Sequence, residues 1–340
     1  LIAGRADLAM ASRPISAGER AALAARGVEV EEAVIALDGL AVIVHPGQSV
    51  QQLQLDTLRR VFAGEIRDWS QLGGRPGRIA LHARDERSGT WDTFRSLVLG
   101  SRSLAAEARR YESTDALAAE VARDPNAIGF VGLAGMRGVR ALAIADGAAA
   151  LRPEPREVAV EDYLLARRLY LYAPRPLRAD IDQLLRFVQS EEGQVIVEQV
   201  GFVAQHVRAF ATDLPARAPQ PYRELVSGAQ RLSLNLRFDE GSAKLDSKAE
   251  VDLQRLAAYL RAPERARREV ILIGFADASE IAPLQAEFLS NDRADHVADR
   301  MAALGLRADR VRGLGGSLPL SIDDSPAGRA RNRRVEVWVR

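Results

Sequence analysis

The chain contains no cysteine in its 340 residues. This absence excludes disulfide bonds, thiolate metal sites, a cysteine nucleophile and a lipid-modified cysteine within these residues. Lysine is almost as rare and occurs only at Lys244 and Lys248, so arginine carries nearly all of the positive charge. The arginine excess indicates a compositional bias and identifies no function by itself.

The sequence also lacks long apolar runs and a strong net charge. No stretch approaches the ~18 apolar residues of a membrane-spanning helix, so we expect no transmembrane segment. The formal net charge of +1 gives no overall attraction to nucleic acid or to a membrane surface. Hydrophobic residues make up 47% of the chain, which is enough to fill real cores, and the length indicates two domains or slightly more.

Groups that carry metal or acid–base chemistry are scattered along the chain. The four histidines include no pair at the spacing of metal ligands, and no two carboxylates stand out as an acid/base couple. We therefore expect no catalytic residues, no metal, no cofactor and a protein that is not an enzyme. The histidines are His45, His82, His206 and His296.

Residues 1–208 alternate between strand-like and helix-like patterns, which predicts an α/β domain with mostly parallel sheets. The run 40–44 is continuously apolar, as expected for a strand that is buried on both faces. Strands are predicted at 7–11, 28–35, 40–46, 79–83, 127–132, 139–145 and 169–174. Helices are predicted at 17–26, 55–62, from about 89 to 99, and at 105–110 and 113–121, with one helix or two over 180–200.

Residues 209–228 change character, because Pro215, Pro219 and Pro221 alternate there with alanine and arginine. We predict a stiff connector and a domain boundary at this place. The remaining residues, 229–340, predict a small α+β domain of βαβαβ order with an additional terminal strand. Its strands are predicted at 232–238, 270–275 and 335–339, and its helices at 249–261 and 283–304.

The stretch from Arg84 to Thr90 lies between a predicted strand and a predicted helix. Ser88 or Thr90 can cap the helix, and Gly89 lets the backbone approach a ligand closely. A helix start offers free N–H groups, and Arg84 adds a forked cation. This combination suits a small oxyanion such as phosphate. The alternative is an ordinary capped helix beside a surface arginine.

The first 208 residues resemble the phosphate-binding periplasmic proteins of the PstS type, which are substrate-binding subunits of ABC importers. The resemblance implies a type II fold of two lobes that close on the anion about a hinge. It also implies that Arg84, Ser88, Gly89 and Thr90 are the phosphate contacts of one lobe. The landmarks occur in the family's order at 6–13, 38–44, 55–69, 84–90, 128–132, 168–172 and 192–194.

Two departures from this family bear on the anion. The family often has an aspartate at the position of Arg13, where it accepts the proton of a protonated phosphate, so Ser12 and Arg13 are further candidate contacts. Pointing inward, Arg13 would favour a more fully ionised anion; pointing outward, it is a solvated surface charge. The family also has a strand–helix–strand unit before residues 6–13 that supplies the other lobe's contacts. The sequence begins too late to hold it, so we expect an N-terminally incomplete domain with half a binding site.

Residues 230–340 resemble the OmpA-like peptidoglycan-binding domain, through the stretches 238–245, 273–277, 289–294 and 332–336. The resemblance implies that Asp277 and Arg293 hold the diaminopimelate of the peptide stem. An ammonium would meet Asp277 and a carboxylate would meet the fork of Arg293. The alternative is a plain salt bridge between these two residues. Ala286 replaces the family's usual asparagine, and Asp277 and Arg293 are 16 residues apart, one more than is usual. Both departures affect the loop 278–288 and its contacts with the peptide stem.

Together these features predict a non-enzymatic protein of the Gram-negative envelope, in the periplasm and associated with peptidoglycan or the outer membrane. Its expected partners are inorganic phosphate or a similar oxyanion, the diaminopimelate stem of peptidoglycan, and an ABC importer or envelope protein. No nucleic acid is expected. The alternative is a wall-anchored sensor or scaffold whose PstS-like domain has lost anion binding and contacts a protein partner.

Overall fold

The computed structural model describes residues 1–147, 150–280, 282–323 and 325–340. It divides into two compact units. Unit 1 comprises Leu1–Asp146, Ala150–Val158 and Tyr163–Ala204, and unit 2 comprises chiefly Gln205–Arg340 with the short segment Ala159–Asp162. Among the described residues, no helix combines the length and apolar character needed to cross a bilayer.

A seven-stranded mixed sheet forms the framework of unit 1, in the order β1-β9-β2-β6-β4-β5 with β7 added beside β2. The expectation of mostly parallel strands is wrong here. Only β4 pairs in parallel with its neighbours β5 and β6, whereas β2 runs antiparallel to both β9 and β6. A separate parallel pair consists of β3 (Gln52–Gln54) and β8 (Ala143–Ala145). The sheet strands are β1 (Ala9–Ala11), β2 (Val30–Val44), β4 (Ala80–Arg84), β5 (Arg109–Tyr111), β6 (Ala127–Gly132), β7 (Arg140–Ala141) and β9 (Ala166–Pro174).

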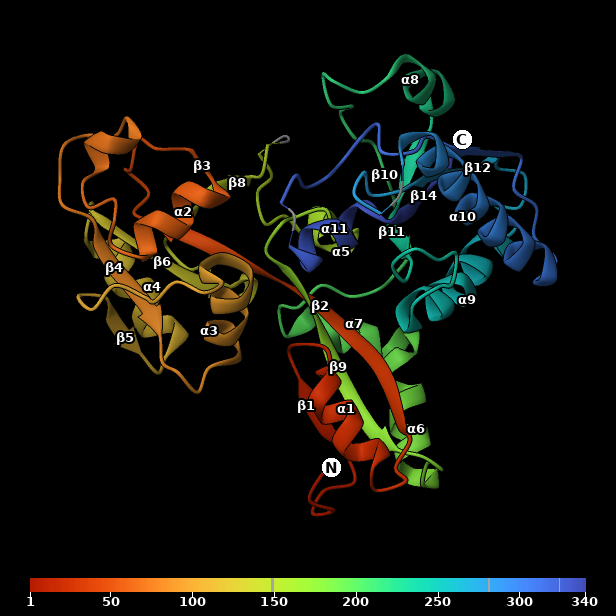
Figure 1. Ribbon diagram of the computed structural model, residues 1–340, viewed down its shortest axis with the longest axis horizontal. Helices are drawn as coiled ribbons and strands as arrows, with labels where there is room; N and C mark the ends of the chain where they lie inside the picture. The colour runs from red at the N-terminus through yellow and green to blue at the C-terminus, as the bar shows by residue number, and fades with distance from the viewer. Residues whose placement is uncertain (148–149, 281, 324) are drawn as a thin grey trace. The chain divides into compact units, whose positions relative to one another are not determined.

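Strand β2 joins the two lobes of unit 1. The sequence predicts two strands in this region, but the structure has one continuous strand of 15 residues. Its first part, Val30 to Gly39, pairs with β9, and its second part, Leu40 to Val44, pairs with β6. Figure 1 shows it as one long ribbon from the β1–β9 group to the β4–β5–β6 group. Pairing partners on both halves keep the chain extended where the sequence alone indicates a break.

Helices cover both lobes of unit 1. In one lobe, Leu185 of α6 packs on Ala33 and Leu171 of the sheet. In the other, the rings of Phe94 and Phe130 stack, and the ring of Phe62 packs edge-on against both. The helices are α1 (Ala17–Ala24), α2 (Leu55–Phe62), α3 (Gly89–Phe94), α4 (Thr114–Arg123), α5 (Pro155–Ala159), α6 (Ala179–Gln189) and α7 (Glu191–Gln199).

One predicted helix of unit 1 differs from the structure, and one open alternative is settled by it. The predicted helix 105–110 is wrong, because Arg109–Tyr111 instead forms β5 along the edge of β4. Sheet pairing overrides the helix preference of this alanine-rich stretch. Of the two alternatives for 180–200, one helix or two, the structure has two. They divide at Ser190, whose hydroxyl accepts a hydrogen bond from the Gly193 N–H and caps α7.

Unit 2 is a five-stranded sheet in the order β10-β11-β14-β12-β13. One face packs against α9 and α10 through a core that includes Leu232, Leu253 and Val297. Its elements are β10 (Ala209–Phe210), α8 (Gln220–Val226), β11 (Gln230–Arg237), α9 (Ser247–Arg261), β12 (Val270–Phe275), α10 (Pro283–Ala303), β13 (Arg310–Gly313), α11 (Pro326–Asn332) and β14 (Arg334–Val339).

The proline-rich segment 209–228 differs from the connector that its composition predicts. Its first residues form β10 on the edge of β11, and α8 follows with Pro221 in its first turn. Tyr222 and Val226 of α8 are buried against Ile271 and Trp338 on the second face of the sheet. This segment therefore packs within unit 2.

Glycines set the distance between α10 and the sheet of unit 2. Gly274 of β12 and Gly313 of β13 are register partners. A Cβ atom on Gly274 would lie 2.0 Å from the Ser290 carbonyl oxygen, and one on Gly313 would lie 2.3 Å from the Asn291 nitrogen. Only glycine lets the helix backbone come this close. The contact brings Arg293, one turn further along α10, to the carboxyl end of β12.

Candidate functional site

The loop between β4 and α3 reaches the end of β1. Ser88 caps α3, because its hydroxyl accepts a hydrogen bond from the Thr90 N–H at 3.2 Å. The next residue, Gly89, lies against Ser12, whose hydroxyl donates to the Gly89 carbonyl at 3.5 Å. A Cβ atom on Gly89 would lie 2.8 Å from the Ser12 Oγ. Two candidate segments that are 77 residues apart thus meet in unit 1.

Arg167 of β9, which the sequence analysis missed, joins this cluster. Its guanidinium donates to the Gly89 carbonyl at 2.8 Å, to Thr93 Oγ1 at 3.0 Å and to Thr90 Oγ1 at 3.3 Å. It also donates twice to Oδ2 of Asp38, at 2.6 and 3.0 Å. The available signal was Asp38 itself, a carboxylate inside the otherwise apolar run 33–44, which requires a buried partner.

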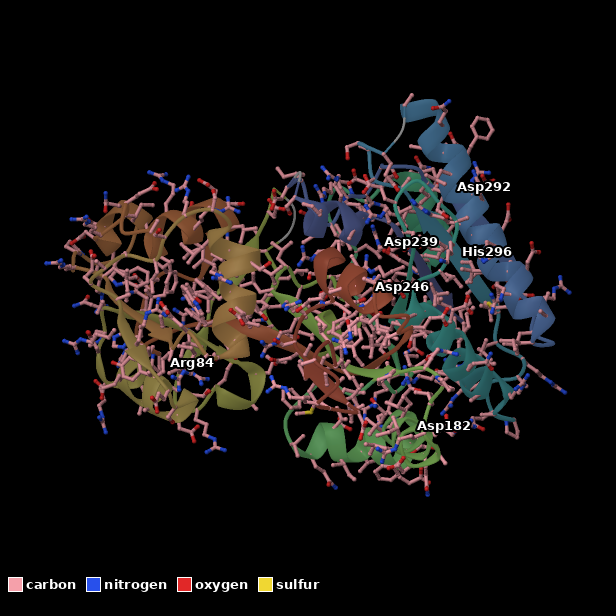
Figure 2. All side chains as sticks on the ribbon, turned by 60° about the horizontal axis from the view of Figure 1, so that its bottom comes forward. Arg84, Asp182, Asp239, Asp246, Asp292 and His296 are labelled. Atoms are coloured by element: carbon pink, nitrogen blue, oxygen red, sulfur yellow. The ribbon has the colours of Figure 1, made fainter. Side chains whose placement is uncertain are left out.

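Arg84 makes a different set of contacts. Its guanidinium donates to the carbonyls of Tyr111 at 3.1 Å and Glu112 at 2.7 Å, and to the hydroxyl of Thr114. Its exposed side-chain fraction is 14%. Figure 2 labels Arg84 in the lobe of β4 and α4. In the part of the chain that the structure describes, Arg84 has no hydrogen bond to Ser12, Gly89 or Thr90 and instead holds the β5–α4 connection.

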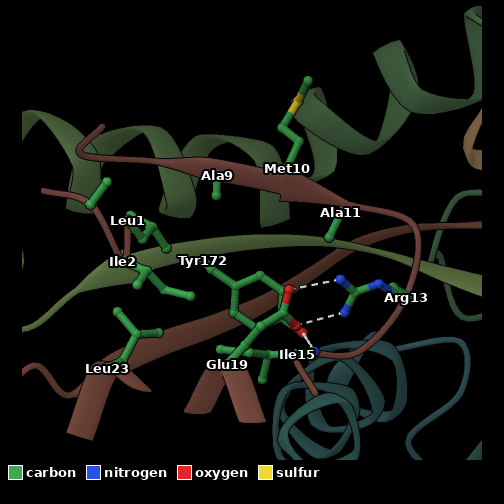
Figure 3. A pocket seen from close by; sticks show the side chains of 11 residues that line it. Leu1, Ile2, Ala9, Met10, Ala11, Arg13, Ile15, Glu19, Leu23 and Tyr172 are labelled. Carbon is green, nitrogen blue, oxygen red and sulfur yellow. Dashed lines mark hydrogen bonds and ion pairs between the residues drawn. The ribbon is translucent and has the colours of Figure 1, made fainter. Parts of the chain in front are cut away.

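Arg13 is bonded to Glu19 at the surface, with both N···O distances at 2.7 Å. The Arg13 side chain is 56% exposed. Its hydrogen bond, with further ones from Ser16, lowers the pKa of Glu19 to about 2. Figure 3 shows the pair beside Tyr172 in a largely apolar pocket of about 380 Å³. None of Arg84, Ser88, Gly89 and Thr90 lines that pocket.

The cluster that the structure brings together is therefore rich in hydroxyl groups. We call Ser12, Ser88, Gly89, Thr90 and Arg167 the loop cluster. It offers hydroxyl donors beside a guanidinium, which is chemistry that suits an oxyanion. The charge of Arg167 is balanced by Asp38, so hydrogen bonds rather than net positive charge dominate there.

Asp277 occupies the carboxyl end of β12 in unit 2 and is 5% exposed. Its carboxylate accepts hydrogen bonds from Asn332 Nδ2 at 2.6 Å and from the Ser279 N–H at 2.9 Å. Burial alone would raise the pKa of Asp277, but the hydrogen bonds from Ser279 and Asn332 outweigh it and lower the pKa. Asp277 is therefore a charged carboxylate at neutral pH.

Arg293 of α10 is fully buried and forms a bidentate ion pair with Glu280, with N···O distances of 2.8 and 3.0 Å. A direct salt bridge between Asp277 and Arg293, the alternative interpretation of the motif, does not occur among the described residues. Glu280 was not singled out from the sequence. It lies in the loop 278–288, of which Ile281 lies outside the described residues.

The Glu280 carboxylate has further donors. The Gly241 N–H bonds to Oε1 and the Asp277 N–H bonds to Oε2, both at 2.9 Å. The Arg333 Nε lies 3.9 Å from Oε1. We call Arg293, Arg333 and the N–H groups of Gly241 and Asp277 the carboxylate cradle. No group of three or more acidic or histidine side chains within the described ranges is arranged to hold a metal ion.

A family model described as PBP superfamily domain matches residues 1–192, and an OmpA family model matches residues 237–333. The chain belongs to the PBP superfamily. We call unit 1 the PBP domain and unit 2 the OmpA domain. The two-lobed periplasmic-binding-protein fold and the OmpA-like domain predicted from the sequence are both confirmed.

Curated relatives match the PBP domain. The phosphate-binding protein PstS of Staphylococcus epidermidis is 26% identical over 224 residues, which cover 63% of this chain and 68% of the relative. The PstS protein of Staphylococcus aureus (strain USA300) is 25% identical over the same lengths. Both relatives are named for phosphate binding.

Solved structures match the same domain. A phosphate ABC transporter substrate-binding protein from Clostridium perfringens, described as putative and with bound phosphate, has a TM-score of 0.51 and 26% identity. The match covers 60% of this chain and 81% of that one. A possible phosphate-binding protein from Planctomyces limnophilus has a TM-score of 0.51 and 28% identity, covering 60% and 77%.

Proposed function

We propose that this chain is a non-enzymatic binding protein of the bacterial envelope. Its PBP domain binds phosphate or a similar oxyanion, and its OmpA domain binds the diaminopimelate stem of peptidoglycan. The similarity to proteins named for phosphate binding supports the first part. The OmpA family match supports the second. The periplasm is the compartment in which both ligands are met, and an ABC importer is the partner that the similarity to a transporter subunit suggests.

The observation that carries the phosphate proposal is the loop cluster. It joins the Ser88–Thr90 loop of one lobe to Ser12 after β1 and to Arg167 of β9. Hydroxyls and a guanidinium that converge from both lobes are the donors an oxyanion needs, and closing the lobes shields them from water. The capping role of Ser88 fixes the loop that carries Gly89 and Thr90.

The contacts of Arg84 and Arg13 favour a second candidate function. Arg84 donates to the β5–α4 connection and Arg13 is bonded to Glu19. With these cations committed to protein groups, the PBP domain would serve as a wall-held sensor or scaffold that contacts a protein partner.

Calorimetric titration of the full-length protein with inorganic phosphate separates the two candidates. Ser88→Ala removes the hydroxyl that caps α3, and Ser113→Ala is the control because the Ser113 hydroxyl caps α4, where it accepts a hydrogen bond from the Ala116 N–H. Each variant loses about 1 kcal/mol of stability through its cap. We expect saturable binding by the wild type and the control. Binding by Ser88→Ala should be weaker by about tenfold to a hundredfold, since a hydrogen bond to a charged ligand contributes about 1.5–3 kcal/mol. No binding by the wild type would reject the phosphate proposal in favour of the second candidate.

A further inference from the structure

Glu280 fills the carboxylate cradle of the OmpA domain. We propose that Glu280 is an internal competitor, which occupies the place of a peptide-stem carboxylate and must leave before that ligand binds. This inference rests on the proposed peptidoglycan-binding function and adds the regulation of that site.

The cradle is a complete receptor for a carboxylate group. Arg293 presents both ends of its fork to the two Glu280 oxygens, at 2.8 and 3.0 Å. Backbone N–H groups from two separate loops, those of Gly241 and Asp277, bond to the same two oxygens at 2.9 Å. Bidentate guanidinium pairing with further N–H donors is the strongest recognition of a carboxylate that protein groups provide. Any ligand carboxylate that enters the cradle must replace Glu280.

The cradle also has a donor that Glu280 leaves unused. Arg333 is 8% exposed and its Nε donates to the Phe238 carbonyl, yet its Nη1 is buried and has no hydrogen-bond partner in the described part of the chain. Buried donors are normally satisfied, so an orphaned one beside an anion site is a donor that a ligand acceptor can satisfy once Glu280 has left. A second ligand oxygen would satisfy it.

The second half of the ligand's chemistry is set by Asp277. Its carboxylate is charged and lies beside the cradle, since its own N–H bonds to Glu280. It accepts hydrogen bonds from Asn332 and Ser279 and retains capacity for an ammonium donor. The site therefore selects a zwitterion with a carboxylate for Arg293 and an ammonium for Asp277, the pattern at the free end of diaminopimelate.

The position of Glu280 in the fold allows it to move. It lies in the connection between β12, which ends at Phe275, and α10, which begins at Pro283, so its carboxylate belongs to neither the sheet nor the helix and can leave without disrupting them. Burial alone would raise the pKa of Glu280, but Arg293 and the N–H groups of Gly241 and Asp277 lower it. The competitor is therefore an anion under the same conditions as the ligand.

Competition of this kind raises the apparent Kd for the ligand in inverse proportion to the fraction of molecules in which the site is open. If the cradle is open in about one molecule in ten, removing Glu280 tightens binding about tenfold. Glu280→Ala empties the cradle, and Glu280→Gln keeps the side-chain shape while removing its charge. Glu250→Gln is the control for loss of a carboxylate charge, because Glu250 forms a bidentate pair with Arg300 at an exposed position outside the cradle.

The experiment measures binding of full-length protein to meso-diaminopimelate by calorimetry and to diaminopimelate-type murein sacculi by co-sedimentation. We expect about tenfold tighter binding for Glu280→Ala, a smaller gain for Glu280→Gln, and no change for Glu250→Gln. Adding Asp277→Asn to Glu280→Ala should abolish the gain. Thermal unfolding monitors folding, and Glu280→Gln carries the test if Glu280→Ala does not fold.

The outcomes separate this inference from the proposed function. Wild-type binding with unchanged or weaker binding by the folded Glu280 variants would overturn the competitor role while leaving peptidoglycan binding intact. No binding by the wild type and by the folded variants would overturn both.

Discussion

Asp38 and Arg167 stand directly opposite each other on β2 and β9, and their side chains form a buried ion pair with an N···O distance of 2.6 Å. The pair lies where β2 passes from its β9 partner to its β6 partner. Strand β2 joins the two lobes, and Arg167 ties this strand to the loop that carries Gly89 and Thr90. One ion pair connects the framework of the PBP domain to its candidate site.

Breaking this pair should be costly. We expect Arg167→Ala to lower the free energy of unfolding of the PBP domain by about 3–5 kcal/mol, because it leaves the Asp38 carboxylate buried without its cation. The double variant Asp38→Asn/Arg167→Met removes both charges, so its free energy of unfolding should fall by less than that of the single variant. Urea unfolding measures both. A double variant that is the less stable of the two would contradict the ion-pair account.

The stability of the OmpA domain should fall in acid through Glu336. This buried carboxylate of β14 lies beside Arg231 and Arg334 and accepts a hydrogen bond from Tyr222 at 2.8 Å. Burial alone would raise its pKa, but the two arginines outweigh burial and lower the pKa from 4.5 to about 2. A lowered folded-state pKa stabilises the fold above pH 4.5, and this stabilisation is lost as the pH falls toward 2.

The matching measurement compares wild type with Glu336→Gln in urea between pH 4.5 and about 2. Over this range the free energy of unfolding of the wild type should fall by about 3 kcal/mol more than that of the variant. A stability difference that stays constant with pH would show that Glu336 is not the responsible group.

Gly274 and Gly18 should respond in opposite directions to alanine. A Cβ atom on Gly274 would lie 2.0 Å from the Ser290 carbonyl, whereas Gly18 in α1 has nothing within 4 Å of that position. We expect Gly274→Ala to destabilise the OmpA domain by at least about 2 kcal/mol through overpacking. Gly18→Ala should stabilise the PBP domain by roughly 0.5–1 kcal/mol. Scanning calorimetry should show a shift in one transition for each variant, and a shift of the same sign in both would contradict the packing.

Much of the fold follows from local sequence patterns. The helices at α2 and α9 and the strands β6 and β12 have clear periodicity and clear ends, and they form where that pattern predicts. What the sequence does not contain is the identity of a strand's neighbour. Arg109–Tyr111 is a strand because it pairs with β4. Residues 30–44 form the single strand β2 because one half pairs with β9 and the other with β6.

The candidate sites show the same limit. Motif order located the loop around Gly89 and the pair Asp277 and Arg293, because those residues stand at fixed places between strands and helices. The partners Arg167 and Glu280 lie elsewhere in the sequence pattern, and only tertiary contacts bring them to those residues. Tertiary packing decides that Arg167 faces the loop and that Glu280 fills the fork of Arg293, and no local sequence pattern indicates either contact.

The most direct test of the two-part proposal asks whether the chain holds phosphate while bound to the wall. Full-length protein is equilibrated with murein sacculi and radiolabelled phosphate, the sacculi are sedimented, and protein and phosphate left in solution are measured. We expect the wild-type protein to leave the solution with the sacculi and to take phosphate with it in a fixed ratio. The Ser88→Ala variant should sediment equally but take less phosphate. Protein that sediments without depleting phosphate, or protein that stays in solution, would contradict it.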